Sequence, residues 1–271
     1  MVEYIKVILI GIIEGITEWL PVSSTGHMLL FDEFVPLEMS AEFKEMFFVV
    51  IQFGAILAVI AAFWRRMLPF ELKNKKLELK TDKLMMWVHV FIACIPAAVL
   101  GLLFDDFLEA YFGNAFTISL MLVVYGVAFI LIENRNKRKK PKIGSISQID
   151  YKLALIIGCF QALSMIPGTS RSGATIIGAL ILGVSRVAAA EFTFYLAVPT
   201  MLGASLLKFV KFGLDFSMNE IVALMLGSAT AFGVSVLVVK FLMNYVKRHD
   251  FKVFGWYRII LGIVVLIVTM I

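Results

Sequence analysis

The sequence is poor in charged residues, histidine and cysteine, and these scarcities exclude several classes of protein. Only 17% of its 271 residues are charged and 61% are hydrophobic, against about 25% and about 45–50% in soluble domains. An ordinary soluble globular domain is therefore excluded. The two cysteines, Cys94 and Cys159, lie inside apolar stretches and form no disulfide or zinc pattern. The net charge of +5 comes from short basic segments between apolar runs, which indicates membrane orientation and no nucleic-acid partner.

Long apolar runs are what the sequence has in abundance. A spanning helix needs about 20 mainly apolar residues. Six runs meet that length: 46–64, 86–104, 116–132, 187–207, 221–239 and 253–271. Two further stretches, 5–34 and 153–184, are apolar runs broken in the middle by polar residues. The pattern predicts an all-α integral membrane protein with six transmembrane helices and two re-entrant helical hairpins.

Charge predicts the orientation of these elements. Lys and Arg mark cytoplasmic loops, so the basic segments 65–83, 134–151 and 244–252 are expected inside, and 105–115 and 213–220 outside. The two hairpins then enter from opposite sides of the membrane, 5–34 from the outside. Residues 1–271 are thus predicted to form a single membrane domain of two inverted repeats. The repeats are 1–133 and 152–271, each a hairpin plus three spans, with 134–151 as a basic cytoplasmic linker.

Similarity between the halves supports the repeat. Leu9–Gly15 resembles Ile156–Ala162 in its apolar and glycine pattern. Pro21 aligns with Pro167 after a one-residue gap, and the pair Ser23-Ser24 aligns with Thr169-Ser170. Broken backbone at membrane depth must be buried in protein or line a wet cavity. Both polar breaks are therefore expected to face inward, toward one shared site.

The first break runs from Glu14 to His27 and contains two carboxylates four residues apart. Glu14 and Glu18 share one helix face, and their repulsion in a low dielectric requires a cation, a shared proton or strong donors. A divalent cation, Mg²⁺ or alternatively Ca²⁺, would suit such a pair together with phosphate oxygens. The structural alternative is that one glutamate only braces the broken backbone.

Hydroxyl groups and an imidazole follow the carboxylates. Ser23, Ser24 and Thr25 precede or begin a new helix, where one hydroxyl is explained as an ordinary N-cap. A helix N-terminus also binds anions, so all three are candidate phosphate-binding residues. His27 follows Ser24 by three residues, a spacing within reach of a nucleophile–base pair.

The second break, Pro167–Gly173, contains the only Arg or Lys between Lys152 and Arg186. A guanidinium binds phosphate or carboxylate oxygens bidentately and keeps its charge when buried. Arg171 together with the hydroxyls of Thr169, Ser170 and Ser172 therefore favours a multiply charged oxyanion such as a diphosphate. The structural alternative is that Arg171 reaches the interface or pairs with Glu191.

The two breaks resemble the two signature motifs of the bacterial undecaprenyl-diphosphate phosphatases, the bacitracin-resistance membrane proteins. The first motif corresponds to 14–27, the second to 167–175, and the resemblance covers essentially the whole chain. It implies hydrolysis of a lipid diphosphate at the outer face of the bacterial plasma membrane, with a divalent cation, to regenerate the carrier for cell-wall synthesis. It also implies catalytic roles for Glu14, Glu18, Ser24, His27 and Arg171, with Ser170 beside Arg171 on the phosphate.

Several alternatives remain open at the level of sequence. The nucleophile is Ser24, His27 or water. Inverted repeats with broken helices are also typical of transporters, so the second candidate function is a secondary transporter or flippase for a lipid phosphate. A homodimer is left open, as are the identity of the metal and the preferred tail length.

Overall fold

The computed structural model describes residues 2–73, 76–213 and 215–270, whose regular elements are helices apart from one short β-hairpin. The ends of the predicted repeats, residues 1 and 271, lie outside the described residues, as do 74–75 and 214. In chain order the elements are α1 Val2–Thr17, α2 Ser24–Phe34, α3 Ala41–Val50, α4 Gln52–Met67, β1 Phe70–Lys73, β2 Lys76–Leu79, α5 Thr81–Phe112, α6 Ala115–Asn136, η1 Ile146–Gln148, α7 Tyr151–Ala162, η2 Leu163–Met165, α8 Arg171–Ile181, α9 Arg186–Phe212, α10 Met218–Tyr245 and α11 Lys252–Met270.

Six helical segments of the described chain are long and apolar enough to cross a membrane, and each corresponds to one predicted span. They are Ala41–Met67, Thr81–Phe104, Ala115–Asn136, Arg186–Phe212, Met218–Tyr245 and Lys252–Thr269. Their outer faces expose more large apolar side chains than a protein dissolved in water carries. Leu102, Val210 and Leu237, for example, are 75%, 79% and 70% exposed. The protein is a multi-pass membrane protein.

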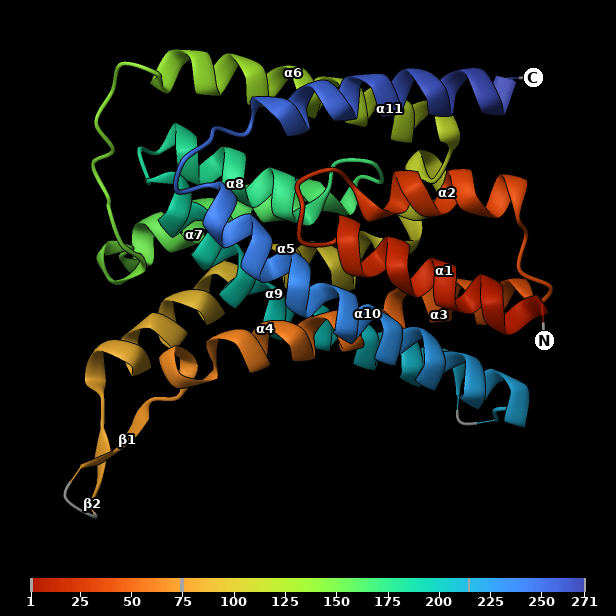
Figure 1. The fold of residues 1–271 in the computed structure, drawn as a ribbon, viewed down its shortest axis with the longest axis horizontal. Helices are drawn as coiled ribbons and strands as arrows, with labels where there is room; N and C mark the ends of the chain where they lie inside the picture. Colours follow the sequence, from red (N-terminus) through yellow and green to blue (C-terminus); the bar gives the residue numbers. More distant parts are fainter. Residues whose placement is uncertain (1, 74–75, 214, 271) are drawn as a thin grey trace.

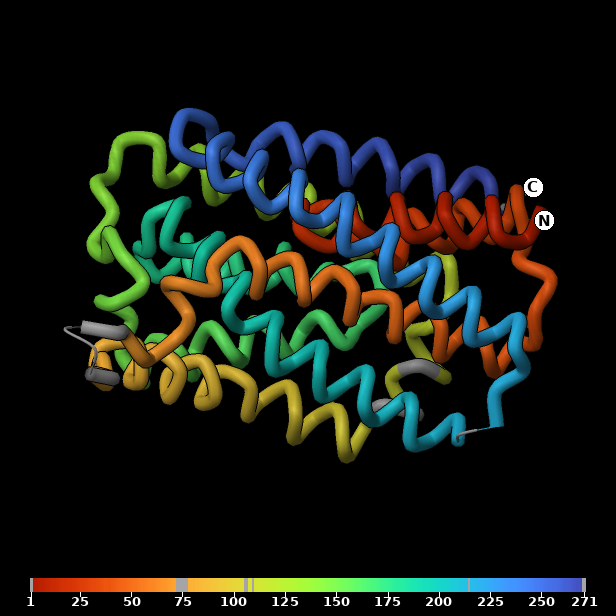
Figure 2. The backbone as a smooth tube through the Cα atoms, turned by 60° about the horizontal axis from the view of Figure 1, so that its bottom comes forward, coloured from red at the N-terminus to blue at the C-terminus, as the bar shows by residue number. Residues whose placement is uncertain are grey.

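Two helical hairpins occupy the positions of the predicted broken stretches. Residues 5–34 lie in α1 and α2, and residues 153–184 contain α7, η2 and α8. In Figure 1 the open end of the α1–α2 hairpin lies at the right and that of the α7–α8 hairpin at the left, so their turns meet in the middle of the molecule. The start of α1 and the end of α11 lie at the same end of the molecule (Figures 1 and 2).

Helices pack in pairs around these hairpins. α1 lies along α10, α7 along α5 and α6 along α11 (Figure 2). Glycine allows close backbone approach in such membrane packing. A Cβ on Gly158 would lie 2.3 Å from the Ala93 carbonyl oxygen, and one on Gly54 only 2.0 Å from that of Ser228. The first contact fixes the α7–α8 hairpin against α5, and the second packs α4 against α10.

The structure differs from the sequence-based expectation in two connections. The basic segment 65–83 contains the antiparallel strands β1 and β2, because Phe70, Leu72, Leu77 and Leu79 alternate with polar residues in strand fashion. The predicted outer loop 105–115 is mostly helical, since α5 continues to Phe112 through good helix formers such as leucine and alanine.

Candidate active site

Each hairpin turn leads into its second helix through a strained serine. Ser23 precedes α2 with φ 74° and ψ 104°, and Ser170 precedes α8 with φ 69° and ψ 121°. Among the described residues they are the two non-glycine positions with positive φ. Such conformations cost about 1–3 kcal/mol and persist only where the surroundings impose them, often at functional sites. The outliers therefore point to the two turns as the place to look for a site.

An ion pair joins the two turns. The Arg171 guanidinium donates from Nε and Nη2 to Oε1 of Glu18, at 3.3 and 3.0 Å, and both side chains are about nine-tenths buried. Its Nη1 donates to the Thr193 carbonyl at 3.1 Å. The predicted convergence of the two polar breaks is thus confirmed. The alternative pairing of Arg171 with Glu191 is not made, because Glu191 binds Arg66.

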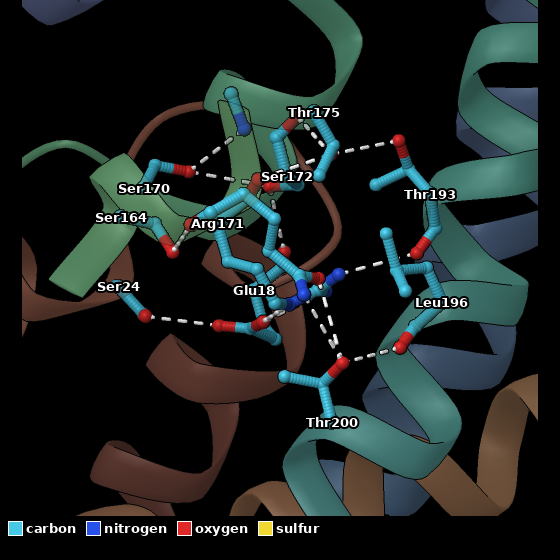
Figure 3. A network of polar contacts seen from close by, with 12 residues as sticks. Glu18, Ser24, Ser164, Ser170, Arg171, Ser172, Thr175, Thr193, Leu196 and Thr200 are labelled. Atoms are coloured by element: carbon cyan, nitrogen blue, oxygen red, sulfur yellow. Dashed lines mark hydrogen bonds and ion pairs between the residues drawn. The ribbon is translucent and has the colours of Figure 1, made fainter. Parts of the chain in front are cut away.

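Ser24 completes this cluster. Its hydroxyl donates to Oε2 of Glu18 at 3.1 Å, so Glu18 lies between Ser24 and Arg171 (Figure 3). Arg171 polarises one carboxylate oxygen while the other accepts the serine proton. A carboxylate that already holds a hydroxyl proton by a hydrogen bond is placed to act as a base toward that hydroxyl.

His27 is held by other groups. Its Nδ1 lies 2.7 Å from the Ser23 carbonyl oxygen and its Nε2 lies 2.6 Å from the Tyr257 hydroxyl, with the two rings stacked at 5.5 Å. A carbonyl only accepts, so Nδ1 carries the proton and, in the neutral ring, Nε2 accepts from Tyr257. Among the hydrogen bonds of the described residues, the expected Ser24–His27 contact is therefore absent.

The remaining predicted hydroxyls divide into accessible and buried groups. Ser170 accepts the Gly173 N–H at 3.2 Å, an N-cap of α8, and lies 3.2 Å from Ser172. Ser172 is 1% exposed and donates to the Glu18 carbonyl oxygen at 3.1 Å, which braces the two turns together. Ser23 and Thr169 are also buried, while Thr25 is exposed. In this state the hydroxyls of Ser24, Thr25 and Ser170 are the accessible ones.

Glu14 is the one buried carboxylate here whose two oxygens lack a hydrogen-bond partner among the described residues. It lies one helical turn from Glu18, and the Glu18 N–H donates to its carbonyl oxygen at 3.0 Å. An orphaned carboxylate fits a hard divalent cation, which takes oxygen ligands and keeps several waters. The described residues contain no group of three or more His, Cys, Asp or Glu able to hold a metal. Phosphate oxygens and water would have to complete the coordination.

Sequence reasoning missed Arg258 and Tyr257, which α11 brings to the site. Arg258 is fully buried, and its guanidinium donates to the carbonyl oxygens of Gly168 at 2.8 Å, Thr169 at 2.9 Å and Pro21 at 3.3 Å. It thus binds both turns at once. The signal was present, because a lone arginine inside an apolar span is costly and marks a functional position.

Comparisons with known proteins find similarity along nearly the whole chain. Residues 7–264 match the family model described as bacitracin resistance protein BacA. An undecaprenyl-diphosphatase of Enterococcus faecalis is 62% identical over 269 residues, covering 99% of this chain and 98% of the relative. Undecaprenyl-diphosphatases of Desulfitobacterium hafniense and Acetivibrio thermocellus are 56% and 54% identical over 98% of this chain, covering 96% and 98% of those relatives.

Proposed function

Since the chain belongs to the bacitracin resistance protein BacA family, we propose that it is an undecaprenyl-diphosphatase. It removes the terminal phosphate of undecaprenyl diphosphate within the membrane, which returns the lipid carrier to cell-wall synthesis and confers bacitracin resistance. The observation that carries the assignment is the Ser24–Glu18–Arg171 chain, which spans both hairpin turns. It places a hydroxyl, a base and a phosphate-binding guanidinium at one point.

Binding of the diphosphate uses the two helix N-termini and Arg171. The starts of α2 and α8 present free N–H groups and positive dipole ends to an anion. An incoming phosphate replaces Glu18 as the acceptor of the hydrogen bonds from Arg171 Nε and Nη2. The guanidinium then binds the phosphate bidentately. Arg258 keeps both turns in register by binding their carbonyl oxygens.

The chemical step follows from the hydrogen bond between Ser24 and Glu18. Ser24 Oγ attacks the terminal phosphorus while its proton passes to Glu18, and the bond from that phosphorus to the bridging oxygen breaks. Undecaprenyl phosphate leaves, and water then hydrolyses the phosphoserine. His27 and water remain the competing nucleophiles. Trapping a phosphorylated enzyme and mapping the label decides among them, since label on His27 contradicts the serine route.

A divalent cation, Mg²⁺ or Ca²⁺, is proposed beside Glu14. Its orphaned oxygens support this position, with Glu18 as the second carboxylate when substrate has displaced it from Arg171. When bound, the cation would neutralise charge on the diphosphate oxygens.

The proposed topology is that of two inverted repeats with re-entrant hairpins, and the site opens toward the periplasm or cell exterior. Three features support it: the opposite entry of the hairpins (Figure 1), the matched positive-φ serines Ser23 and Ser170, and the basic linker 134–151. Basic segments are retained in the cytoplasm, which puts the open end of the α1–α2 hairpin outside.

The test is phosphate release from detergent-solubilised protein given undecaprenyl diphosphate. Turnover is expected without any membrane to transport across, and the serine-to-alanine variant at Ser24 should lose it. A transporter or flippase of lipid phosphate needs an anion site but not a hydroxyl bound to a carboxylate. Binding of the lipid without phosphate release, in both proteins, would contradict the hydrolase assignment.

A further inference from the structure

A cavity lies at the far end of α8 from Arg171. It has a volume of about 350 Å³ and is walled by the end of α6, the linker after it, the end of α8 and the start of α9. The axis of α8 has a rise of roughly 16 Å over its length, so this cavity is separate from the two hairpin turns. Its volume is in the range of ordinary small-molecule sites, roughly 300–1,000 Å³.

The charge of this cavity is strongly positive. Five basic residues and a single acidic one, Glu133, line it. Glu133 is already occupied, because Arg186 donates to both its oxygens and the Phe251 N–H donates to one of them. Four basic side chains therefore have no carboxylate partner among the described residues: Arg135, Lys139, Lys140 and Lys142.

The walls are fixed by hydrogen bonds. The Lys142 and Ile143 N–H groups donate to the Gly183 carbonyl oxygen, at 2.9 and 3.2 Å, and the Ser185 N–H donates to Ile143 at 2.8 Å. Asn136 Nδ2 donates to the Leu180 carbonyl oxygen at 3.0 Å. The linker is thus tied to the α8–α9 connection, and the cavity is preformed. Preformed sites bind at a lower entropic cost.

The cavity combines this charge with apolar surface. Leu180, Ile181, Leu182 and Val187 contribute to its lining, and Ile181 is 40% exposed. It also lies where the apolar spans α6 and α9 give way to polar sequence, which is the level of the lipid headgroups. The start of α9 adds a positive dipole end.

We propose that this cavity binds the phosphate headgroup of an anionic phospholipid from the surrounding leaflet. Basic pockets between transmembrane helices recognise such headgroups, and the apolar part of the lining accommodates the start of the acyl chains. Membrane orientation alone does not account for the arrangement. Orientation depends on how many basic residues a loop has, whereas here Lys139, Lys140 and Lys142 line the cavity and Lys137 and Arg138 do not.

That difference provides a matched pair of variants. K139Q/K140Q and K137Q/R138Q remove the same charge from the same exposed segment, but only the first pair lines the cavity. Delipidated protein in detergent is titrated with phosphatidylglycerol, phosphatidylcholine or inorganic phosphate, and bound lipid is counted by native mass spectrometry. Wild type and K137Q/R138Q are expected to retain phosphatidylglycerol in preference to phosphatidylcholine. K139Q/K140Q should bind it about 30-fold more weakly, in keeping with the summed contribution of two basic residues near a lipid surface.

Each other outcome contradicts the proposal. Equal loss in both double variants would mean a general surface potential and no site. Equal binding of both lipids, together with binding of inorganic phosphate by the wild type, would assign the cavity to soluble phosphate. Phosphatase activity of K139Q/K140Q in detergent should stay at the wild-type level, so this test is independent of the proposed function.

Discussion

The turn before α2 and the turn before α8 have the same backbone conformation but present side chains of different chemistry. Ser23 and Ser170 differ by only a few degrees in φ, 74° against 69°, and each precedes an 11-residue helix. The residue that follows is Ser24 in the first turn and Arg171 in the second. One strained connection thus presents a hydroxyl in one half and a guanidinium in the other, at corresponding positions.

The difference shows how a two-fold arrangement can become an asymmetric site. The first turn contributes a carboxylate and a hydroxyl, and the second contributes a cation and its hydroxyl neighbours. The capping also differs, because the Ser170 hydroxyl accepts the Gly173 N–H while the Ser23 side chain makes no cap hydrogen bond. The second turn is therefore braced by its own serine and the first is braced by its surroundings.

The largest expected effect on activity comes from replacing the guanidinium of the second turn, Arg171. Arg171→Lys should lower kcat/KM by about 10³-fold, since a point charge cannot replace a bidentate fork on the transferred phosphate. The measurement is phosphate release by purified protein at matched folding. Arg66→Lys is the control, because Arg66 forms an exposed pair with Glu191 and should keep near-normal turnover. Normal activity of Arg171→Lys would remove its assigned role.

The carboxylate of the first turn should matter next. Glu18→Gln is expected to reduce kcat by about 100-fold, because the amide cannot take the Ser24 proton although it retains the shape of the side chain. Single-turnover kinetics separate this loss from substrate binding. If kcat is unchanged and the metal dependence is the same, Glu18 is not the base. The first turn then does not supply the base for a phosphate held by the second turn.

Arg258 links the turns, so its replacement tests whether they depend on each other. Arg258→Lys should lower the free energy of unfolding by about 2 kcal/mol, because several charge-assisted hydrogen bonds to carbonyl oxygens are lost. Thermal unfolding in detergent gives the stability, and limited proteolysis at the two turns should show both opening together. Opening of only one turn would mean that the link is dispensable to the other.

The smallest effect separates the two serines. Ser170→Ala should cost about 1 kcal/mol of stability through loss of the α8 cap. Ser23→Ala should change the free energy of unfolding by less than about 0.5 kcal/mol, since no cap hydrogen bond is removed. Melting temperatures of the two variants compare them directly. Equal destabilisation would show that the two turns are braced in the same way.

Sequence alone predicted the elements that follow from composition and desolvation. The six spans and the convergence of the two polar breaks were accessible because long apolar runs and isolated charges have few alternatives in lipid. Arg258 was missed because one charge hardly changes the average of a long apolar run. The roles of the individual site residues stay predictions, since no measurement of activity bears on them.

Backbone geometry at the turns could not be predicted from spacing. The interval from Ser24 to His27 favoured a contact between them, but the imidazole binds the Ser23 carbonyl oxygen instead. The one-residue gap in the alignment of the halves is likewise not needed. The positive-φ backbone matches Ser23 with Ser170, the same offset that relates Gly15 to Ala162, so Pro21 and Pro167 do not occupy matching positions.

The position of Arg258 has a consequence for biosynthesis. The guanidinium that binds both turns lies on α11, which follows every other described helix in the chain. Both turns are synthesised and inserted before Arg258, so in the nascent chain they should lack its hydrogen bonds. We expect catalytic competence only after α11 has been inserted, so a half-inserted intermediate does not hydrolyse the lipid diphosphate.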